Sequence, residues 1–272
     1  MNYALQLRRE LAQRALYYAQ KQALPHTLSY AESPVVCFPS AEKEHGNFHP
    51  ASYRAILADP AWQRRLTKVH TLGRRSLPQS DHGRWMELDT CTSSDALLMN
   101  VFCHPQVMRG AVPGLLGIDA EVRARFGLRA RVPLRNGHSD RTEIDMRLGD
   151  LLVEAKLTEG DFQKTEKHVL GEYRDFGDIF DAEGLPQTEQ HYVSYQLLRN
   201  VLAAHNLECC FCVLFDARRP DLIDAWYAVM RCVRPVELRT RLRVLTWQEL
   251  AAALPCSLQI FLADKYGIDP AS

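Results

Sequence analysis

The chain has 272 residues, of which 46% are hydrophobic, and its formal net charge is zero. A chain of this length and apolar content can bury a substantial core, which excludes a disordered protein. A net charge of zero gives no overall attraction to a polyanion, so any contact with nucleic acid must come from local basic patches.

The N-terminal part is expected to be mainly helical and irregular. Residues 2–22 are amphipathic and charged, which predicts a helix and does not fit a secretory leader. A second helical stretch follows over residues 51–70. His45 and His49 lie between the two, at a spacing that metal ligands can have, but we expect them to be surface loop histidines.

The rest of the chain alternates short strand patterns with helical ones, which favours a mixed α/β domain. "SSDALLMNVF" offers Ser93 or Ser94 as the N-cap of an apolar helix. The predicted strands are residues 129–135, 142–148, 150–157 and 209–216. The predicted helices are residues 115–126, 188–205, 220–233 and 246–254, the last with Thr246 and Glu249 at capping-box spacing. We therefore expect a helical extension over residues 1–85 and a main domain over residues 86–272.

Several common chemistries have no support in the sequence. The chain has no GxxxxGK[ST], GxGxxG, HExxH or GxSxG motif, which argues against a P-loop ATPase, a dinucleotide enzyme, a zincin and a common serine hydrolase. The eight cysteines include no CxxC pair and are expected to be reduced core residues. The longest apolar run, residues 209–215, is too short to cross a bilayer, so we expect a cytoplasmic protein without a membrane partner.

The stretch "RTEIDMRLGDLLVEAKLTEGDF" places three charges inside two apolar strand patterns. If Gly149 and Asp150 form a two-residue hairpin turn, Asp145 lies opposite Glu154. Period-two alternation then places Lys156 on the face of Glu154. Ile144, Met146, Val153, Ala155 and Leu157 fill the opposite face. The charges therefore gather on one face of the hairpin, beside an intact hydrophobic face.

Two opposed carboxylates repel unless a positive charge lies between them, and hard oxygen ligands suit Mg²⁺ or Mn²⁺. The carbonyl of Ala155 is a further candidate ligand, and Lys156 could orient a nucleophilic water or stabilise developing negative charge. This constellation suits hydrolysis of phosphodiester bonds. A solvated hairpin face with a Glu–Lys pair is the alternative explanation, but unpaired charges are expensive in strands as apolar as these.

These residues carry a resemblance to a known superfamily. Asp145, Glu154, Ala155 and Lys156, followed by a helix with "YQLLRN", resemble the PD-(D/E)xK nucleases. "SSDALLMNVF", "EAKLTEGDF", "YQLLRN" and "FLADKYG" are similar to a bacterial group of restriction-endonuclease-like proteins within that superfamily, over residues 87–267. The resemblance implies a restriction-endonuclease-like α/β core, a mixed central sheet flanked by helices. It also implies a Mg²⁺-dependent nuclease, with a DNA endonuclease as the first expectation.

The resemblance also assigns roles to single residues. It implies that Asp145 and Glu154 bind the metal ion and that Lys156 assists the nucleophile. Glu121 is the best-placed candidate for an additional metal ligand from a helix upstream, although a solvated helix carboxylate near several arginines explains it equally well. Gln196 lies in an apolar helix, where a buried amide needs a partner, and we weigh it evenly between the catalytic site and the core.

Arginine-rich pieces flank the expected site: "RARFGLRARVPLR" precedes it, and "ARRP" and "RTRLR" follow it. Such pieces could supply sequence-independent contacts to nucleic acid, although exposed surface positions explain any single arginine equally well. The competing function is a nuclease-like binding or interaction module without catalytic activity of its own. A homodimer, the choice of DNA over RNA, and the role of residues 1–85 stay open.

Overall fold

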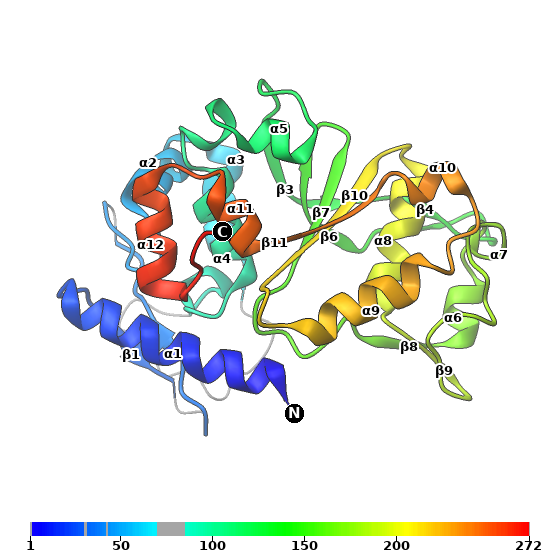
Figure 1. Cartoon of the computed structure of the whole chain (residues 1–272), viewed down its shortest axis with the longest axis horizontal. Coiled ribbons are helices and arrows are strands. Elements are labelled where there is room, and N and C mark those ends of the chain that lie inside the picture. Colours follow the sequence, from blue (N-terminus) through cyan, green and yellow to red (C-terminus); the bar gives the residue numbers. More distant parts are fainter. Residues whose placement is uncertain (1, 30–31, 42, 70–84, 272) are drawn as a thin grey trace. The chain divides into compact units, whose positions relative to one another are not determined.

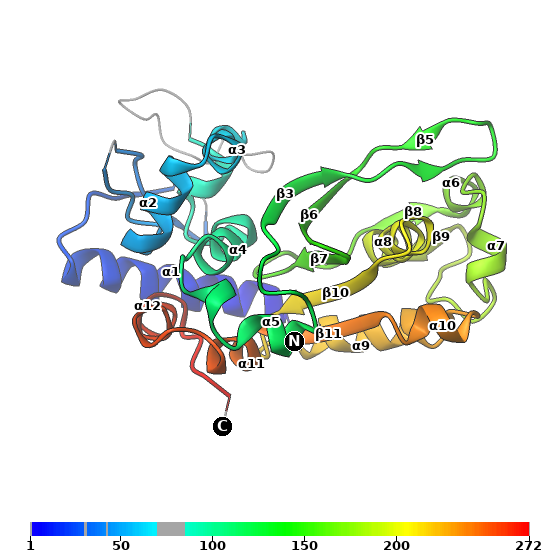
Figure 2. The same cartoon turned by 90° about the horizontal axis from the view of Figure 1, so that it is seen from above.

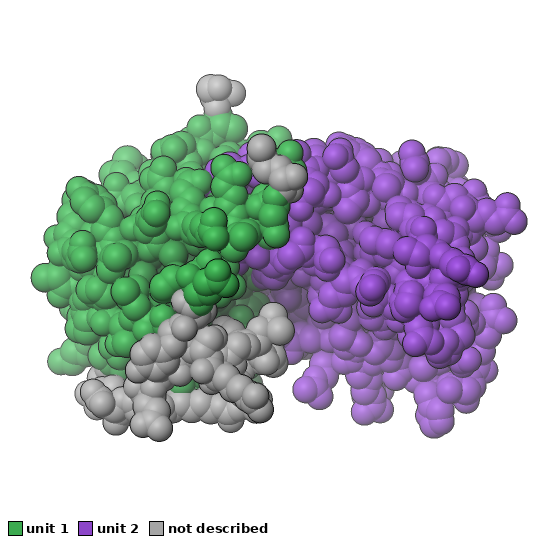
Figure 3. Space-filling model, turned by 90° about the horizontal axis from the view of Figure 1, so that it is seen from below, with its two compact units in different colours: residues 1–124, 246–272 green, residues 125–245 purple. Residues whose placement is uncertain are grey.

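The computed structural model describes residues 2–29, 32–41, 43–69 and 85–271 (Figure 1). The chain forms two compact units: unit 1 comprises residues 1–124 and 246–272, and unit 2 comprises residues 125–245 (Figure 3). The boundary that we expected between residues 85 and 86 falls inside unit 1. Among the described residues, no helix combines the length and the apolar character that spanning a bilayer requires.

Unit 1 is mainly helical. Its helices are α1 (Tyr3–Lys21), α2 (Pro50–Ala58), α3 (Pro60–Gln63), α4 (Ser94–Phe102), α5 (Val112–Leu116), α11 (Trp247–Ala252) and α12 (Cys256–Tyr266), with 3₁₀ turns at Arg64–Thr67, Glu87–Asp89 and Val107–Arg109. Two short antiparallel strands, β1 (Thr27–Leu28) and β2 (Val36–Cys37), complete the unit. Helix α1 buries residues four apart, because such residues share one helix face: Leu7, Leu11, Ala15 and Ala19.

The ends of these helices follow the capping signals of the sequence. Ser93 is the N-cap of α4 and accepts a hydrogen bond from the backbone N–H of Ala96 (3.1 Å), as predicted. Thr246 and Glu249 form the predicted capping box of α11. All eight cysteines are free and seven of them are buried, so the predicted reduced core cysteines are confirmed, with Cys256 as the exposed exception.

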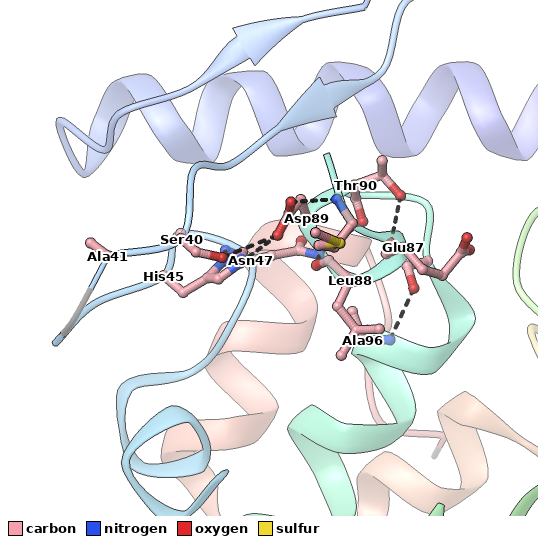
Figure 4. Close-up of polar contacts among 12 residues, drawn as sticks. Ser40, Ala41, His45, Asn47, Glu87, Leu88, Asp89, Thr90 and Ala96 are labelled. Carbon is pink, nitrogen blue, oxygen red and sulfur yellow. Dashed lines mark hydrogen bonds and ion pairs between the residues drawn. The ribbon is translucent and has the colours of Figure 1, made fainter. Parts of the chain in front are cut away.

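A buried polar network ties the loop before α2 to the segment before α4 (Figure 4). His45 is 4% exposed, and its Nδ1 accepts from the backbone N–H of Asn47 (3.1 Å). Because a neutral imidazole carries one proton, Nε2 holds that proton and donates it to Asp89 Oδ1 (3.1 Å). The amide of Asn47 donates to the carbonyls of Leu88 and Thr90. The expectation of a surface loop histidine is therefore wrong for His45, which helps to fix this loop.

His49 is half-buried and also has a structural role. Its Nδ1 accepts from the backbone N–H of Ala51 (3.2 Å) and so caps the N-terminus of α2. Its ring lies 5.0 Å, between centroids, from that of His104. Burial lowers the pKa of His49 most, and His104 and Arg54 lower it further, from its ordinary value to about 4.

Unit 2 carries a five-stranded mixed sheet, so the chain is an α/β protein. The strand order is β11-β10-β7-β6-β3, formed by β11 (Leu242–Thr246), β10 (Cys210–Phe215), β7 (Leu151–Ala155), β6 (Glu143–Leu148) and β3 (Ala124–Arg129). Strands β6 and β7 are antiparallel, whereas β10 is parallel to β7. The remaining elements are β4 (Val132–Pro133), β5 (Ser139–Asp140), β8 (Lys164–Glu166), β9 (His191–Val193), α6 (Lys167–Gly171), α7 (Phe176–Ile179), α8 (Tyr195–Asn206), α9 (Pro220–Met230) and α10 (Val236–Arg239).

Helices α8 and α9 contribute to the main core of unit 2. Leu197, Val201 and Trp226 belong to one buried cluster with Phe211 and Val213 of β10. The rings of Phe211 and Trp226 meet edge to face, with centroids 5.6 Å apart. Strand β10 lies between β11 and β7, and all six of its residues are buried, which explains why its sequence is a continuous apolar run.

Two predicted helices are partly wrong. Residues 115–126 were expected to form one helix, but α5 ends at Leu116 and β3 begins at Ala124. Residues 188–194 were expected to begin the helix that is now α8, but His191–Val193 form β9, paired with β8. In both segments, pairing with a neighbouring strand overrides the local helix propensity, which is a weak preference.

The cap of α2 predicts how the stability of unit 1 depends on pH. Because the pKa of His49 is lower in the folded protein than in the unfolded chain, only the unfolded chain binds this proton between pH 6.5 and about 4. The free energy of unfolding therefore falls as the pH drops through that window, by at most about 1.4 kcal/mol per pH unit for one histidine. His49→Asn keeps a capping side chain that does not titrate, so it should make the fall shallower.

Urea unfolding of the two proteins between pH 4.5 and 7.5 measures this difference. His168→Asn serves as the control, because His168 is an exposed histidine of unit 2 with 72% of its side chain accessible. Equal slopes for the wild-type chain and His49→Asn would contradict the assignment.

Candidate active site

The charged hairpin of β6 and β7 has the predicted register. Met146 pairs with Val153, Arg147 with Leu152, and Leu148 with Leu151. Gly149 lies in the turn with a φ of 57°, in the left-handed region that glycine adopts without a steric penalty. The predicted two-residue turn is therefore confirmed.

Asp145 and Glu154 occupy the next positions outward in this register. The backbone N–H of Ala155 donates to Oδ2 of Asp145 (2.8 Å), so the carboxylate of Asp145 reaches across to β7 beside Glu154. Asp145 is half-buried, whereas Glu154 is 2% exposed. The hairpin thus brings two carboxylates to neighbouring positions, one of them inside the protein.

Glu154 and Lys156 form a buried ion pair. Nζ of Lys156 lies 2.8 Å from Oε1 of Glu154, and only 6% and 3% of the two side chains are exposed. Burial alone would lower the pKa of Lys156, but the carboxylates of Glu154, Glu159 and Asp145 raise it overall, so the ammonium group is charged at neutral pH. The alternative of a solvated Glu–Lys pair is wrong, because water does not reach this pair freely.

Asn200 of α8 is part of this site and was not predicted from the sequence. Its Nδ2 donates to Oε2 of Glu154 (2.8 Å), and its side chain has no exposed surface. Nε and a terminal nitrogen of Arg199 donate to Oδ1 of Asn200 (3.4 and 3.1 Å), which fixes the amide with its N–H groups toward Glu154. Arg199 also donates to the carbonyl of Glu143 in β6 (3.1 Å). The Arg199–Asn200 pair therefore links α8 to both strands of the hairpin.

The sequence contains one signal that could have identified Asn200. It follows Gln196 by four residues in an apolar helix, so both amides lie on the same helix face. Gln196 is half-buried, and its Oε1 is buried without a hydrogen-bond partner among the residues that the structure describes. Either amide could have been the one that faces Glu154, and the assignment of Gln196 to the catalytic site stays a prediction.

Arg219 fixes the loop that follows Lys156. The guanidinium has no exposed surface and donates to the carbonyls of Glu159 (2.7 Å) and Gly160 (3.0 Å). It also binds both carboxylate oxygens of Asp221 (2.9 and 2.8 Å). Arg219 is therefore buried and engaged by protein acceptors, and a contact of "ARRP" with nucleic acid stays a prediction.

Glu121 lies in unit 1, in a turn between α5 and β3, and is exposed. The helix that was expected to carry Glu121 does not extend to this position, because α5 ends at Leu116. Its proposed contribution to a metal site stays a prediction.

The hairpin offers ligand atoms of the type that binds a small divalent cation. Asp145 and Glu154 offer hard carboxylate oxygens, which Mg²⁺ and Mn²⁺ prefer, and Mg²⁺ is commonly bound by one or two protein carboxylates with water completing its shell. Among the described residues, no group of three His, Cys, Asp or Glu side chains is arranged to hold a metal ion. A cation bound here would share Glu154 with Lys156 and Asn200.

A comparison with protein-family models gives a match over most of the chain. A family model described as "Restriction Endonuclease associating with ARP" matches residues 13–267. Neither the curated proteins nor the solved structures gave a match. The matched range begins within α1 and ends just after α12, so it includes most of the segment that we expected to be an N-terminal extension.

The contact between Asn200 and Glu154 predicts a large effect of charge at position 200. Asn200→Asp would place a second carboxylate against Glu154 without access to water, which should lower the free energy of unfolding at pH 7 by about 3 kcal/mol or more. Asn206→Asp makes the same change at the last residue of the same helix, where Nδ2 donates to the carbonyl of Arg131, and should cost about 1 kcal/mol. Urea unfolding of both variants checks the difference, and equal losses would contradict the proposed contact.

Proposed function

The chain belongs to the family of restriction endonucleases described as associating with ARP, and on this premise we propose that it is a metal-dependent nuclease that hydrolyses phosphodiester bonds of DNA. The observation that carries the proposal is the buried Lys156–Glu154 pair beside Asp145 on one hairpin. Charged groups are costly to bury, so a site that keeps three of them together has a function beyond packing.

The charged residues of the hairpin have distinct roles in this proposal. Asp145 and Glu154 hold Mg²⁺ or Mn²⁺, with the carbonyl of Ala155 as a further ligand. The bound ion supplies a Lewis acid and lowers the pKa of a coordinated water. Lys156, a compact and permanently charged donor at neutral pH, stabilises negative charge that develops on the attacked phosphate.

The residues around the hairpin position these groups. Asn200 holds Oε2 of Glu154, so the carboxylate keeps one orientation while its other oxygen faces Lys156. Arg219 holds the backbone of residues 159 and 160, and thereby limits the movement of the loop after Lys156. A site whose groups are fixed before substrate binds loses less free energy to reorganisation during the reaction.

One observation favours a second candidate function, a nuclease-like binding module without activity of its own. Lys156 and Asn200 already occupy both oxygens of Glu154, so this carboxylate is satisfied without a cation. In that case the pair is structural, and the protein binds nucleic acid or another protein without cleaving it.

Cleavage of supercoiled plasmid in the presence of Mg²⁺ or Mn²⁺ separates the two functions. We expect cleavage that stops on addition of chelator, and a loss of at least two orders of magnitude in Asp145→Ala, which lacks one metal ligand. Asp150→Ala is the matched control, because Asp150 is an exposed acid in the turn of the same hairpin. Binding of DNA without cleavage under all these conditions would favour the module.

Lys156→Met tests the ammonium group itself. We expect cleavage to fall by about 10² to 10³-fold, the range for loss of a positioned group at a developing oxyanion. The same variant leaves Glu154 buried without its ion-pair partner, which should lower the free energy of unfolding by about 3 kcal/mol or more.

The double variant Glu154→Gln/Lys156→Met separates stability from catalysis. Removing both charges should recover most of the lost stability, because no buried charge is left unpaired, while cleavage should not rise above the level of Lys156→Met. A Lys156→Met protein that cleaves at the wild-type rate would rule out the catalytic role of Lys156.

A further inference from the structure

We infer that residues 125–141, the arginine-bearing ribbon that leads into the catalytic hairpin, bind the phosphate backbone of the nucleic-acid substrate. This inference rests on the proposed function and assigns the surface that holds the substrate. The ribbon consists of β3, β4 and β5 with their connections, and it continues directly into β6 (Figure 2).

Charge is concentrated in this ribbon although the whole chain is neutral. Residues 125–141 contain five arginines and one acid, Asp140, which leaves a net charge of +4. The single acid is already engaged, since Oδ2 of Asp140 accepts from the hydroxyl of Tyr173 (2.8 Å) and Oδ1 from the backbone N–H of Thr142 (2.9 Å). One carboxylate cannot offset five guanidinium groups, so the ribbon keeps an excess of positive charge.

All five arginines are exposed: Arg125, Arg129, Arg131, Arg135 and Arg141. Within the described part of the chain, none of their guanidinium groups makes a hydrogen bond or an ion pair. Other arginines of unit 2 are held, for example Arg174 by Asp175, Arg218 by Asp216 and Arg234 by the carbonyl of Gly177. The ribbon thus gathers five exposed arginines without partners among the described residues in one short segment, whereas most other arginines of unit 2 are held by protein groups.

Two of these arginines lie at opposing positions. Val132 pairs with Asp140 in the β4–β5 ladder, so Arg131 and Arg141 occupy the next positions outward. Like charges directly opposite each other on two strands are unfavourable, and an anion between them would reverse the sign of that interaction. Ala130 and Val132 belong to the core of unit 2, so by alternation Arg131 points away from the core.

The backbone of the ribbon is anchored to the body of unit 2. The backbone N–H of Arg135 donates to the carbonyl of Glu172 (2.8 Å), and that of Arg174 donates to the carbonyl of Pro133 (3.1 Å). Nδ2 of Asn206 donates to the carbonyl of Arg131 (3.1 Å). The arginine side chains therefore extend from a fixed backbone, which reduces the entropy lost on binding an anion.

The position of the ribbon in the chain connects it to the chemistry. Arg141 precedes Asp145 by four residues, which is at most about 13 Å along an extended chain. A nucleic acid whose phosphate lies at Asp145 can therefore place neighbouring phosphates on the ribbon. Arginine contacts to phosphate are independent of sequence, so we expect this surface to supply affinity and not base recognition.

Binding of fluorescein-labelled 20-mer DNA, single-stranded and duplex, tests the inference in the Asp145→Ala background, where cleavage does not interfere. We expect Arg131→Ala/Arg141→Ala to weaken binding by about tenfold or more at low salt. The slope of log affinity against log salt should fall in magnitude by about two, one for each lost phosphate contact. Arg231→Ala/Arg239→Ala removes the same charge from exposed positions elsewhere in unit 2 and should change affinity less than twofold.

Equal affinities of the two double variants for DNA would overturn the inference. Binding of poly-glutamate that depends on Arg131 and Arg141, without any binding of DNA, would also overturn it. The outcome is separable from that of the proposed function. If DNA binding depends on these arginines but the protein cleaves no substrate, the role of the ribbon in binding stands and the proposed nuclease activity is contradicted. If Arg131→Ala/Arg141→Ala cleaves plasmid at the wild-type rate, the proposed nuclease activity stands and the proposed role of the ribbon in substrate binding is contradicted.

Discussion

The buried contact between Lys156 and Glu154 is the constraint around which unit 2 is arranged. Removing two charges from water costs several kcal/mol for each ion, and their mutual attraction offsets this cost only when further hydrogen bonds satisfy the remaining atoms. Asn200 supplies one such bond from α8, and the ring of Phe162 lies 5.6 Å from Nζ of Lys156. The backbone N–H of Lys156 donates to the carbonyl of Leu214 in β10 (2.8 Å). Two strands and a helix therefore meet at one ion pair, and a change in any of them alters the geometry of the proposed chemistry.

The sequence was sufficient to predict the hairpin and its register. Gly149 at the first turn position favours a two-residue turn. Apolar residues alternate in both strands, so a shift of one residue in the register would move the apolar face into water. The partner of Glu154 could not be predicted in the same way. Gln196 and Asn200 lie on one helix face, and only the rotation and distance of α8 against β7 determine which amide reaches the carboxylate.

The division of the chain could not be predicted because it depends on contacts between distant segments. Residues 246–272 return to unit 1, where α12 packs against α1 and Asp264 pairs with Lys21 (3.2 Å). No local pattern of composition marks that return. Likewise, the short pattern around His45 indicates a loop, but the partners that bury it come from residues 88–90.

The family match covers residues of both units, and two of the segments on which the sequence resemblance rests have structural roles in unit 1. Asn100 of "SSDALLMNVF" accepts from the backbone N–H of His49 (2.6 Å) and has no exposed surface. Lys265 of "FLADKYG" is fully buried, and its Nζ donates to Oδ1 of Asn47 (2.6 Å). Burial lowers the pKa of Lys265, which lies 4.6 Å from the ring centroid of Phe38. These segments hold unit 1 together, whereas the proposed chemistry belongs to the hairpin of unit 2.

The proposed chemistry depends on a divalent cation held between the two carboxylates of the hairpin. A crystal structure of the protein grown with Mn²⁺, with anomalous scattering recorded at the manganese edge, tests this most directly. We expect an anomalous peak bonded to oxygens of Asp145 and Glu154, at about 2.1 Å for a small divalent ion with oxygen ligands. A well-ordered hairpin without such a peak, with Glu154 held only by Lys156 and Asn200, would contradict it.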